Sequence, residues 1–291
     1  MNKVKSLFIG IYPMLAMSIG GYALYQYLGG KQEPAWLGAV LTTLPLMAFL
    51  MSLLAFKYRA RTSAHFPIFT SLAITGLSLS SVVFFLNPSA DNIVPMGMTV
   101  TGFSTYLLYN FWYSRLGRGK NITLKQGKLL PAFNLENASG ERISSTGFKG
   151  KPAIFMFYRG NWCPLCMAQV REIAQQYREL ESMGVQVALI SPQPHEKTEA
   201  LARKFDVPFE FLVDVKANAA KQLGIFMQDG LPAGMEMFGY DSDTVYPTVI
   251  ITDANGKILY VDQTDNYRVR PEPSTFLAVL NSRSPAISAA Y

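Results

Sequence analysis

The stretch AIFMFYRGNWCPLC, residues 153–166, decides the fold of the C-terminal half of this chain. Ala153–Tyr158 is a short, continuous apolar run of the kind that forms a buried strand. Pro164 fits the first position of a helix, where the backbone N–H that proline lacks is not needed. A second apolar run, Val185–Ile190, follows the helix expected over Pro164–Met183. Strand, helix and strand in this order predict a βαβ unit with two parallel strands.

The sequence after this unit predicts the other elements of an α/β domain. We expect helices over Glu196–Phe205, Ala217–Leu223 and Pro273–Leu280, and strands over Phe209–Val213, Thr248–Thr252 and Lys257–Val261. The last two strands flank Asp253-Ala254-Asn255-Gly256, and Asn-Gly between apolar runs is a strong hairpin signal. The domain is therefore expected over residues 127–281, with a flexible tail over 282–291.

Residues 1–120 have a different character, since they contain four long apolar segments without a charged residue. These are Leu7–Leu28, Trp36–Phe56, Phe66–Leu86 and Ile93–Tyr113. Each exceeds the roughly 18 residues that mark a candidate membrane span. Four such runs in succession favour transmembrane helices over buried core helices. We therefore predict an α-helical membrane region with four transmembrane helices, in contact with the lipid bilayer. The spans hold no Asp, Glu, Lys, Arg, His or Cys, so they offer no redox chemistry.

Basic residues are concentrated in the N-terminal region. Residues 1–120 hold nine basic and two acidic residues, a net charge of +7, whereas the rest hold 17 basic and 18 acidic, a net charge of −1. Lys and Arg precede the first span, separate the second from the third and follow the fourth. This predicts a multi-pass protein of the cell membrane with both termini and the C-terminal domain in the cytoplasm. The near-neutral C-terminal half has no basic patch for nucleic acid.

Cys163 and Cys166 are the two cysteines of the chain, and we expect them to form a redox-active dithiol. With Pro164 at the first helical position, Cys163 becomes the N-cap. Free N–H groups and the helix dipole then favour its thiolate. Cys166 belongs to the apolar stripe that includes Val170 and Ile173, so it is expected to be the more buried thiol. Cys163 is therefore predicted to attack the substrate and Cys166 to resolve the intermediate.

Two other interpretations of this pair fit the sequence less well. The first is half of a zinc site, for which only His195 offers a further ligand, although a structural site needs four. The second is a buried pair without chemistry, for which an N-cap cysteine beside Trp162 is poorly placed. No nucleotide-binding, flavin or metal motif is present, so no cofactor and no metal are expected.

Residues of about 127–281 resemble the redoxin superfamily, whose fold is thioredoxin-like. Within it they resemble the peroxiredoxin-like branch of the alkyl hydroperoxide reductase/thiol-specific antioxidant family. The resemblance rests on Phe157–Cys166, Ile190–Gln193, Tyr246–Thr248 and Asp265–Arg270. It does not extend to the apolar segments.

The resemblance implies further site residues. Pro247 corresponds to a cis-proline that faces the dithiol, and it would bring the backbone of Tyr246, with Thr248 beside it, next to the sulfurs to pair with an extended substrate. The chain also departs from the family pattern. Cys163 stands where the family has Thr or Ser, and Cys166 stands at the position of the peroxidatic cysteine. The resemblance therefore makes Cys166 the attacking thiol, whereas the helix-capping argument favours Cys163.

Other side chains have a functional and a structural interpretation. Arg159 can stabilise a thiolate or a peroxide oxygen, or be a solvated charge at a strand end. Trp162 is expected to pack over the dithiol. His195, Arg268 and Arg270 are expected at the surface, the two arginines in salt bridges.

These observations predict a membrane-anchored thiol-disulfide oxidoreductase or thiol-dependent peroxidase that cycles between a dithiol and a Cys163–Cys166 disulfide. Its substrate would be a peroxide or a protein disulfide. Its electrons would come from an external thiol reductant of the thioredoxin or glutathione type. The alternative is a membrane redox sensor or assembly module, in which the dithiol switches a partner without substrate turnover.

Overall fold

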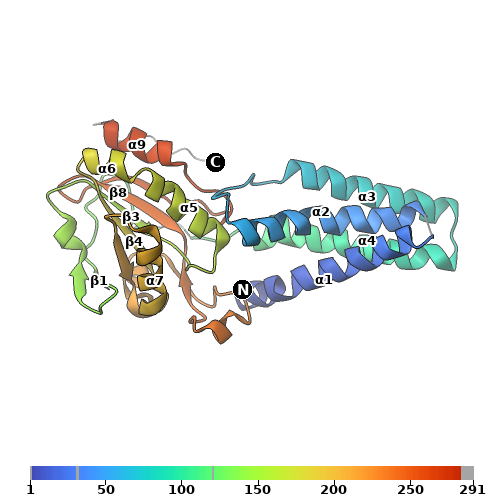
Figure 1. The fold of residues 1–291 in the computed structure, drawn as a ribbon. Helices are drawn as coiled ribbons and strands as arrows, with labels where there is room; N and C mark the ends of the chain where they lie inside the picture. The colour runs from blue at the N-terminus through green and yellow to red at the C-terminus, as the bar shows by residue number, and fades with distance from the viewer. Residues whose placement is uncertain (1, 31–32, 120, 283–291) are drawn as a thin grey trace. The chain divides into compact units, whose positions relative to one another are not determined.

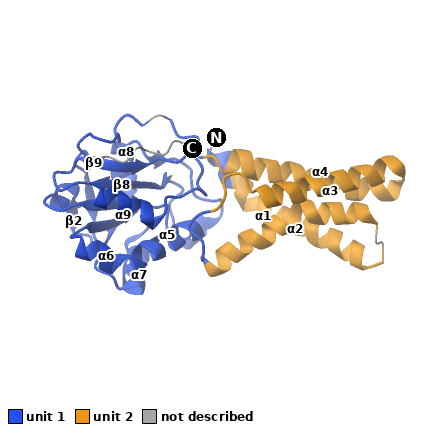
Figure 2. Cartoon of the chain, turned by 90° about the horizontal axis from the view of Figure 1, so that it is seen from above, with its two compact units in different colours: residues 1–6, 57–61, 116–291 blue, residues 7–56, 62–115 orange. Residues whose placement is uncertain are grey.

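The computed structural model describes residues 2–30, 33–119 and 121–282, and these form two compact units (Figures 1 and 2). Unit 1 contains residues 2–6, 57–61, 116–119 and 121–282. Unit 2 contains residues 7–56 and 62–115. The predicted tail lies outside the described residues, apart from residue 282.

Unit 2 consists of helices. They are α1 (Asn2–Leu28, whose first residues belong to unit 1), α2 (Pro34–Phe56), α3 (Pro67–Leu86), α4 (Ala90–Leu107) and the π-helix η1 (Leu108–Tyr113). Among the described residues, α1, α2 and α3 are long and apolar enough to cross a membrane. The expected count of four spans is therefore not confirmed. The segment predicted as the fourth is helical, but α4 has Asp91 and Asn92 in its first turn and contains three threonines, which reduce its hydropathy.

Small residues bring α2 and α3 close together. A Cβ atom added to Gly38 would lie 2.0 Å from Ser80 Oγ and 2.5 Å from the Gly76 carbonyl oxygen. Ser80 Oγ donates a hydrogen bond to the carbonyl oxygen of Ala35 at 2.8 Å and lies 2.8 Å from Thr99 Oγ1 on α4. Small residues and hydroxyl groups of this kind mediate helix packing in membranes.

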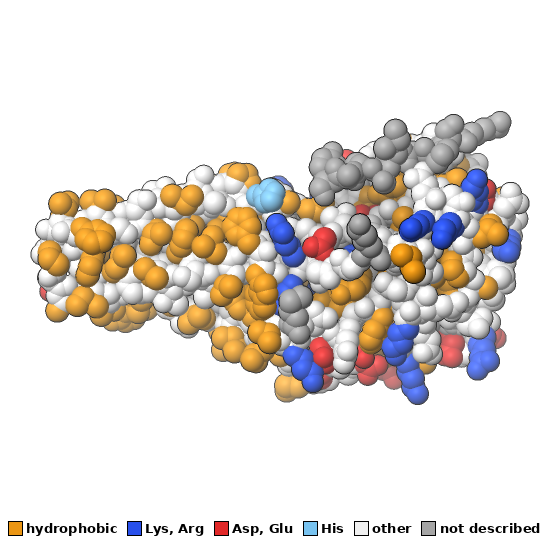
Figure 3. Space-filling view, turned by 180° about the vertical axis from the view of Figure 1, so that it is seen from behind, with side chains coloured by type: hydrophobic (Ala, Val, Ile, Leu, Met, Phe, Trp, Pro, Cys, Tyr) orange, Lys and Arg blue, Asp and Glu red, His pale blue; other side chains and the backbone are white. Residues whose placement is uncertain are grey.

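The surface of unit 2 is apolar. Met14 is 73% exposed, Phe85 77% and Leu86 82%. Figure 3 shows apolar side chains spread over the helices and charged side chains gathered on unit 1. Extended apolar surface of this kind needs an apolar environment.

Unit 1 is an α/β domain around a sheet of seven strands in the order β2-β1-β5-β4-β3-β8-β9. The strands are β1 (Asn134–Glu136), β2 (Arg142–Ser144), β3 (Ala153–Phe157), β4 (Gln186–Ser191), β5 (Glu210–Val213), β8 (Thr248–Thr252) and β9 (Ile258–Asp262). The predicted βαβ unit is confirmed, because β3 and β4 pair in parallel from Ala153↔Gln186 to Phe157↔Ile190. The predicted hairpin is also confirmed, since β8 and β9 are antiparallel neighbours.

The helices of unit 1 follow the predicted order. They are α5 (Pro164–Gln175), α6 (Tyr177–Ser182), α7 (His195–Phe205), α8 (Asn218–Gln222) and α9 (Pro273–Asn281), with short 3-10 turns over Ser145–Phe148, Val215–Ala217 and Met235–Phe238. The single helix predicted from Pro164 to Met183 is divided at Gln176, whose φ and ψ of −91° and 6° leave the helical range. A second ladder, β6 (Phe226–Met227) with β7 (Thr244–Val245), was not predicted.

Candidate functional site

The two cysteines lie at the first turn of α5, which follows β3 and a short loop. Cys163 is the N-cap, as predicted, and its sulfur accepts a hydrogen bond from the backbone N–H of Cys166 at 3.4 Å. Cys166 is fully buried and Cys163 is 2% exposed, so Cys166 is the more buried thiol, as predicted, but Cys163 is buried as well. The residues around the loop cover the N-terminal end of α5, so N-cap position does not bring solvent access here.

The loop before α5 depends on Gly160. Its φ of +146° is one that side-chain-bearing residues rarely adopt, and a Cβ atom there would lie 2.5 Å from Trp162 Nε1. The Gly160 carbonyl oxygen accepts a hydrogen bond from the N–H of Cys163 at 3.2 Å. Gly160 therefore allows the close turn that delivers Cys163 to the start of the helix.

Arg270 brings a positive charge to the more buried thiol. Its Nη2 lies 3.7 Å from the sulfur of Cys166, and its Nε donates to the carbonyl oxygen of Tyr267 at 2.9 Å. Arg270 is 6% exposed and Arg268 1% exposed, so the predicted surface position of both is wrong. Their burial depends on the turn at Asn266, whose side-chain oxygen accepts the N–H of Arg268 at 3.0 Å, a tertiary placement without a local signal.

Arg159 supplies a second buried charge beside the thiols. It is 5% exposed, so the solvated-charge interpretation is wrong. Its guanidinium lies 4.7 Å from the centre of the Trp162 ring and donates to the carbonyl oxygen of Gly230. The Arg159 carbonyl oxygen accepts the hydroxyl of Thr244 at 2.9 Å. The Trp162 ring, which was expected to pack over the dithiol, thus packs against the guanidinium of Arg159.

These contacts shift the pKa values of the two thiols in opposite directions. For Cys166, burial raises the pKa, but a hydrogen bond from the Cys163 thiol, the charge of Arg270 and a backbone hydrogen bond from Arg159 outweigh burial and lower the pKa to about 6. For Cys163, burial, its hydrogen bond to Cys166 and the neighbouring thiolate raise the pKa well above its ordinary value. These contacts therefore favour the thiolate on Cys166 and the protonated thiol on Cys163.

Gln193 joins the loops on either side of the thiols and was not predicted as a site residue. Its Nε2 donates to Tyr158 Oη and to Thr198 Oγ1, both at 3.1 Å, and its Oε1 accepts the N–H of Asn161 at 2.8 Å. Tyr158 is fully buried, and burial together with the charge of Cys166 raises its pKa. The only signal in the sequence was the Ile190–Gln193 stretch of the family resemblance.

The segment Tyr246–Thr248 differs from its expected form. No peptide bond among the described residues is cis, so the predicted cis bond at Pro247 is absent, in line with the ordinary preference for trans. The N–H of Tyr246 donates to the Ile225 carbonyl oxygen at 2.7 Å, so it is already used within the chain and is not waiting for a substrate.

An arginine outside the predicted domain holds this segment. Arg118 donates to the Pro247 carbonyl oxygen and, at 3.2 Å, to Thr248 Oγ1. Its guanidinium lies 5.0 Å from the centre of the Tyr246 ring. Burial lowers the pKa of Arg118 to about 10, while Asp262 opposes this change and Arg270 adds to it. In the sequence, Arg118 is one of the basic residues that follow the fourth apolar segment.

His195 stands apart from the thiols. It begins α7, and its Nε2 lies 2.9 Å from Glu136 Oε2. Within the described part of the chain, no group of three or more His, Cys, Asp or Glu side chains could hold a metal ion. His195 is thus a partly exposed hydrogen-bond partner of Glu136.

Known proteins similar to this chain match its C-terminal part. Residues 126–261 match the model of the AhpC/TSA family. Peroxiredoxin Bcp of Escherichia coli (strain K12) is 29% identical over 138 residues, 47% of this chain and 85% of that protein. The chloroplastic Peroxiredoxin Q of Sedum lineare is 31% identical over 100 residues, 34% of this chain and 54% of that protein.

Solved structures overlap with the same part of the chain. The crystal structure of reduced Prx3 in complex with H2O2 from Vibrio vulnificus is 22% identical, with a TM-score of 0.46, and the match covers 54% of this chain and 99% of that one. Together with the family match, the sheet order and the parallel β3–β4 pair confirm the expected thioredoxin-like α/β domain.

Proposed function

We propose that this chain, whose residues 126–261 form a peroxiredoxin-like domain of the AhpC/TSA family, is a membrane-anchored thiol peroxidase in which Cys166 attacks the peroxide and Cys163 resolves the product. The assignment reverses the roles expected from helix capping. It agrees with the position that the family resemblance gives to Cys166.

One observation carries the proposal: the guanidinium of Arg270 lies 3.7 Å from the sulfur of a fully buried Cys166. A thiolate is the nucleophilic form of cysteine, and a thiolate in an apolar interior requires a compensating charge. Arg270 and Arg159 supply that charge at Cys166. Cys163 retains its proton, and it lies one helical turn away.

The geometry supports a two-step oxidation. The Cys166 thiolate attacks the outer peroxide oxygen, the O–O bond breaks, and an S–O bond forms. The sulfur loses two electrons and becomes a sulfenic acid, while the departing oxygen takes a proton and leaves as an alcohol or water. Arg159 and Arg270 can stabilise the negative charge that develops on that oxygen.

Cys163 then completes the cycle. Its sulfur attacks the sulfenic sulfur, an S–S bond forms, and the hydroxyl leaves as water with the thiol proton. An external thiol of the thioredoxin or glutathione type reduces the resulting disulfide with two electrons. In this proposal the resolving thiol, Cys163, stands at the position where the family has Thr or Ser.

Burial of the sulfurs favours a small substrate. Neither cysteine is more than 2% exposed. A hydroperoxide needs only a narrow approach to the sulfur, whereas exchange with a protein disulfide brings a second backbone to the attacking atom. A peroxide therefore fits the closed site better than a protein disulfide does.

Steady-state turnover of the purified full chain in detergent, with hydrogen peroxide and thioredoxin plus thioredoxin reductase, tests this function. We expect Cys166→Ser to reduce the rate by at least about 1,000-fold, because serine is not ionised at neutral pH. Cys163→Ser should stop turnover with thioredoxin but still consume one equivalent of peroxide.

Two outcomes would redirect the assignment. A Cys163→Ser variant with full turnover would remove the resolving role of Cys163. A wild-type chain that forms the disulfide once with peroxide but shows no turnover with any thiol reductant would favour the alternative role as a membrane redox sensor or assembly module.

A further inference from the structure

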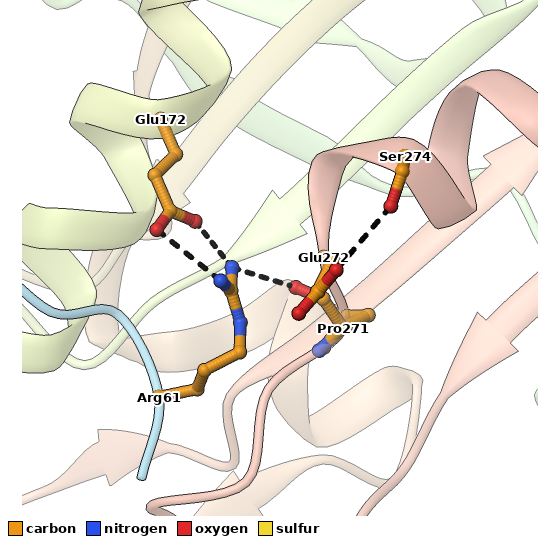
Figure 4. Close-up of polar contacts among 5 residues, drawn as sticks. All are labelled: Arg61, Glu172, Pro271, Glu272 and Ser274. Carbon is orange, nitrogen blue, oxygen red and sulfur yellow. Dashed lines mark hydrogen bonds and ion pairs between the residues drawn. The ribbon is translucent and has the colours of Figure 1, made fainter.

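A short segment next to the apolar helices is part of the thiol domain. Residues 57–61 follow α2 directly in the chain, yet they belong to unit 1. Within this segment the side chain of Arg61 contacts the domain (Figure 4). Arg61 lies outside the family match, and in the sequence it is one of the basic residues between the second and third apolar segments.

The guanidinium of Arg61 has two acceptors on separate elements. Its Nη1 lies 3.3 Å from Glu172 Oε1 and its Nη2 donates to Glu172 Oε2, so the ion pair is bidentate. The same Nη2 lies 3.3 Å from the carbonyl oxygen of Pro271. A planar guanidinium with two acceptors fixes their separation as well as their charge.

Both acceptors belong to elements that form the thiol site. Glu172 is on α5, the helix whose first turn carries Cys163 and Cys166. Pro271 follows Arg270, whose Nη2 contacts the sulfur of Cys166. We propose that Arg61 is a positioning residue of the thiol site, which holds α5 and the Arg270 segment at the separation that keeps Arg270 against Cys166.

The residues that follow Pro271 are fixed by the start of α9. Loss of the Arg61 contact is therefore expected to affect Arg270, which precedes Pro271. Glu272 is the N-cap residue of α9, and its carbonyl oxygen accepts the N–H of Thr275 at 3.0 Å. Ser274 Oγ lies 3.5 Å from Glu272 Oε2 (Figure 4). Because α9 anchors the far end, loss of Arg61 leaves freedom mainly at residues 270 and 271.

Arg61 would therefore affect the acidity of Cys166 without touching it. The ionisable groups around the Cys166 sulfur are Cys163 on the same turn, Arg159 and Tyr158 after β3, and Arg270. Among these groups, Arg270 is the one that directly precedes Pro271, whose carbonyl oxygen Arg61 contacts. The inference rests on the proposed role of Cys166 as a thiolate, and it links residues 57–61 of unit 1 to that thiolate.

The rate of iodoacetamide alkylation of Cys166 tests the inference without peroxidase turnover. We would measure it at pH 6 and pH 9 in the full chain in detergent, in a Cys163→Ser background. If Arg61→Ala raises the pKa by about one unit, the rate at pH 6 falls roughly five-fold, while the rate at pH 9 stays the same. The Arg61→Lys variant should show a similar decrease in the alkylation rate at pH 6, because one ammonium group cannot replace the bidentate guanidinium.

Arg59→Ala is the matched control, since Arg59 lies in the same segment, is exposed and carries the same charge. It should leave the ratio of the two rates unchanged. Arg270→Gln is the positive reference. If Arg61→Ala and Arg61→Lys behave like Arg59→Ala while Arg270→Gln lowers the rate at pH 6, Arg61 is not a positioning residue and the proposed function stands.

If Arg270→Gln also leaves the ratio unchanged, the proposed thiolate site itself fails. Glu172→Gln provides a variant that keeps Arg61 and removes only the carboxylate charge. It should lower the rate at pH 6 by less than Arg61→Ala does, and an unchanged ratio in this variant counts against the ion pair as the link.

Discussion

At the scale of single residues, two cysteines one helical turn apart differ because of groups distant in the sequence. The N-cap position of Cys163 could be predicted from Pro164 alone. The charge at Cys166 could not, because Arg270 lies 104 positions away and nothing local indicates that it is buried. Capping places a weak dipole at Cys163, whereas a full charge lies against Cys166, and the full charge has the larger effect.

The acidity of Cys166 gives a pH prediction. A thiol with a pKa of about 6 is mostly ionised at neutral pH, whereas an ordinary thiol with a pKa of 9.0 is mostly protonated there. In a Cys163→Ser variant, which keeps a hydroxyl donor, the rate of alkylation should rise with pH and reach half its maximum near pH 6. The rate is measured from pH 4 to pH 10. A midpoint above about pH 8 would contradict the arginine environment.

At the scale of elements, apolar runs in the sequence were sufficient for five strands of the sheet. β3, β4, β5, β8 and β9 were all predicted, because runs of four to six residues rich in apolar side chains, bounded by turn residues, leave few other structures. β1, β2, β6 and β7 have two or three residues each, and their pairing partners rather than their own pattern define them. The boundary at Gln176 likewise has no proline or glycine to mark it.

Gly160 gives a prediction for the loop that leads into α5. A Gly160→Ala substitution adds a Cβ atom against Trp162 and places alanine at a φ of +146°, so it should destabilise the domain by about 1–3 kcal/mol. Gly147→Ala is the control, since nothing lies within 4 Å of the added atom. Thermal unfolding of the full chain in detergent compares them. Equal melting temperatures for the two variants would refute the role given to Gly160.

At the scale of the whole molecule, composition predicted the division into an apolar helical region and an α/β domain. It did not predict that residues 2–6, 57–61 and 116–119 belong to the domain unit. Such short polar segments next to apolar runs resemble simple membrane flanks in sequence. Arg61 and Arg118 show that two of them make specific hydrogen bonds to the domain that holds the thiols.

The apolar surface of unit 2 predicts how the full chain is extracted from cells. Residues such as Phe85 and Leu86, 77% and 82% exposed, are poorly suited to water, so the protein should remain in the membrane pellet after alkaline carbonate treatment. Its release into the supernatant would contradict membrane anchoring. A variant with Phe85→Ser and Leu86→Ser, which lacks two exposed apolar side chains at the end of α3, provides the comparison.

The distribution of Lys and Arg predicts the orientation separately. A C-terminal fusion to an enzyme that is active only in the periplasm should show low activity in a bacterial host, because both termini are expected in the cytoplasm. A fusion to an enzyme that is active only in the cytoplasm is the paired control. High activity of the periplasmic reporter would reverse the orientation.

The central claim is that Cys166, held by Arg270, is the thiol that reacts with peroxide. The most direct measurement is mass spectrometry of the full chain after one equivalent of hydrogen peroxide in the presence of dimedone, which traps sulfenic acid. The proposal predicts an adduct on Cys166 in the Cys163→Ser variant and none in the Cys166→Ser variant. An adduct on Cys163 in the Cys166→Ser variant, with none on Cys166 in the Cys163→Ser variant, would contradict it.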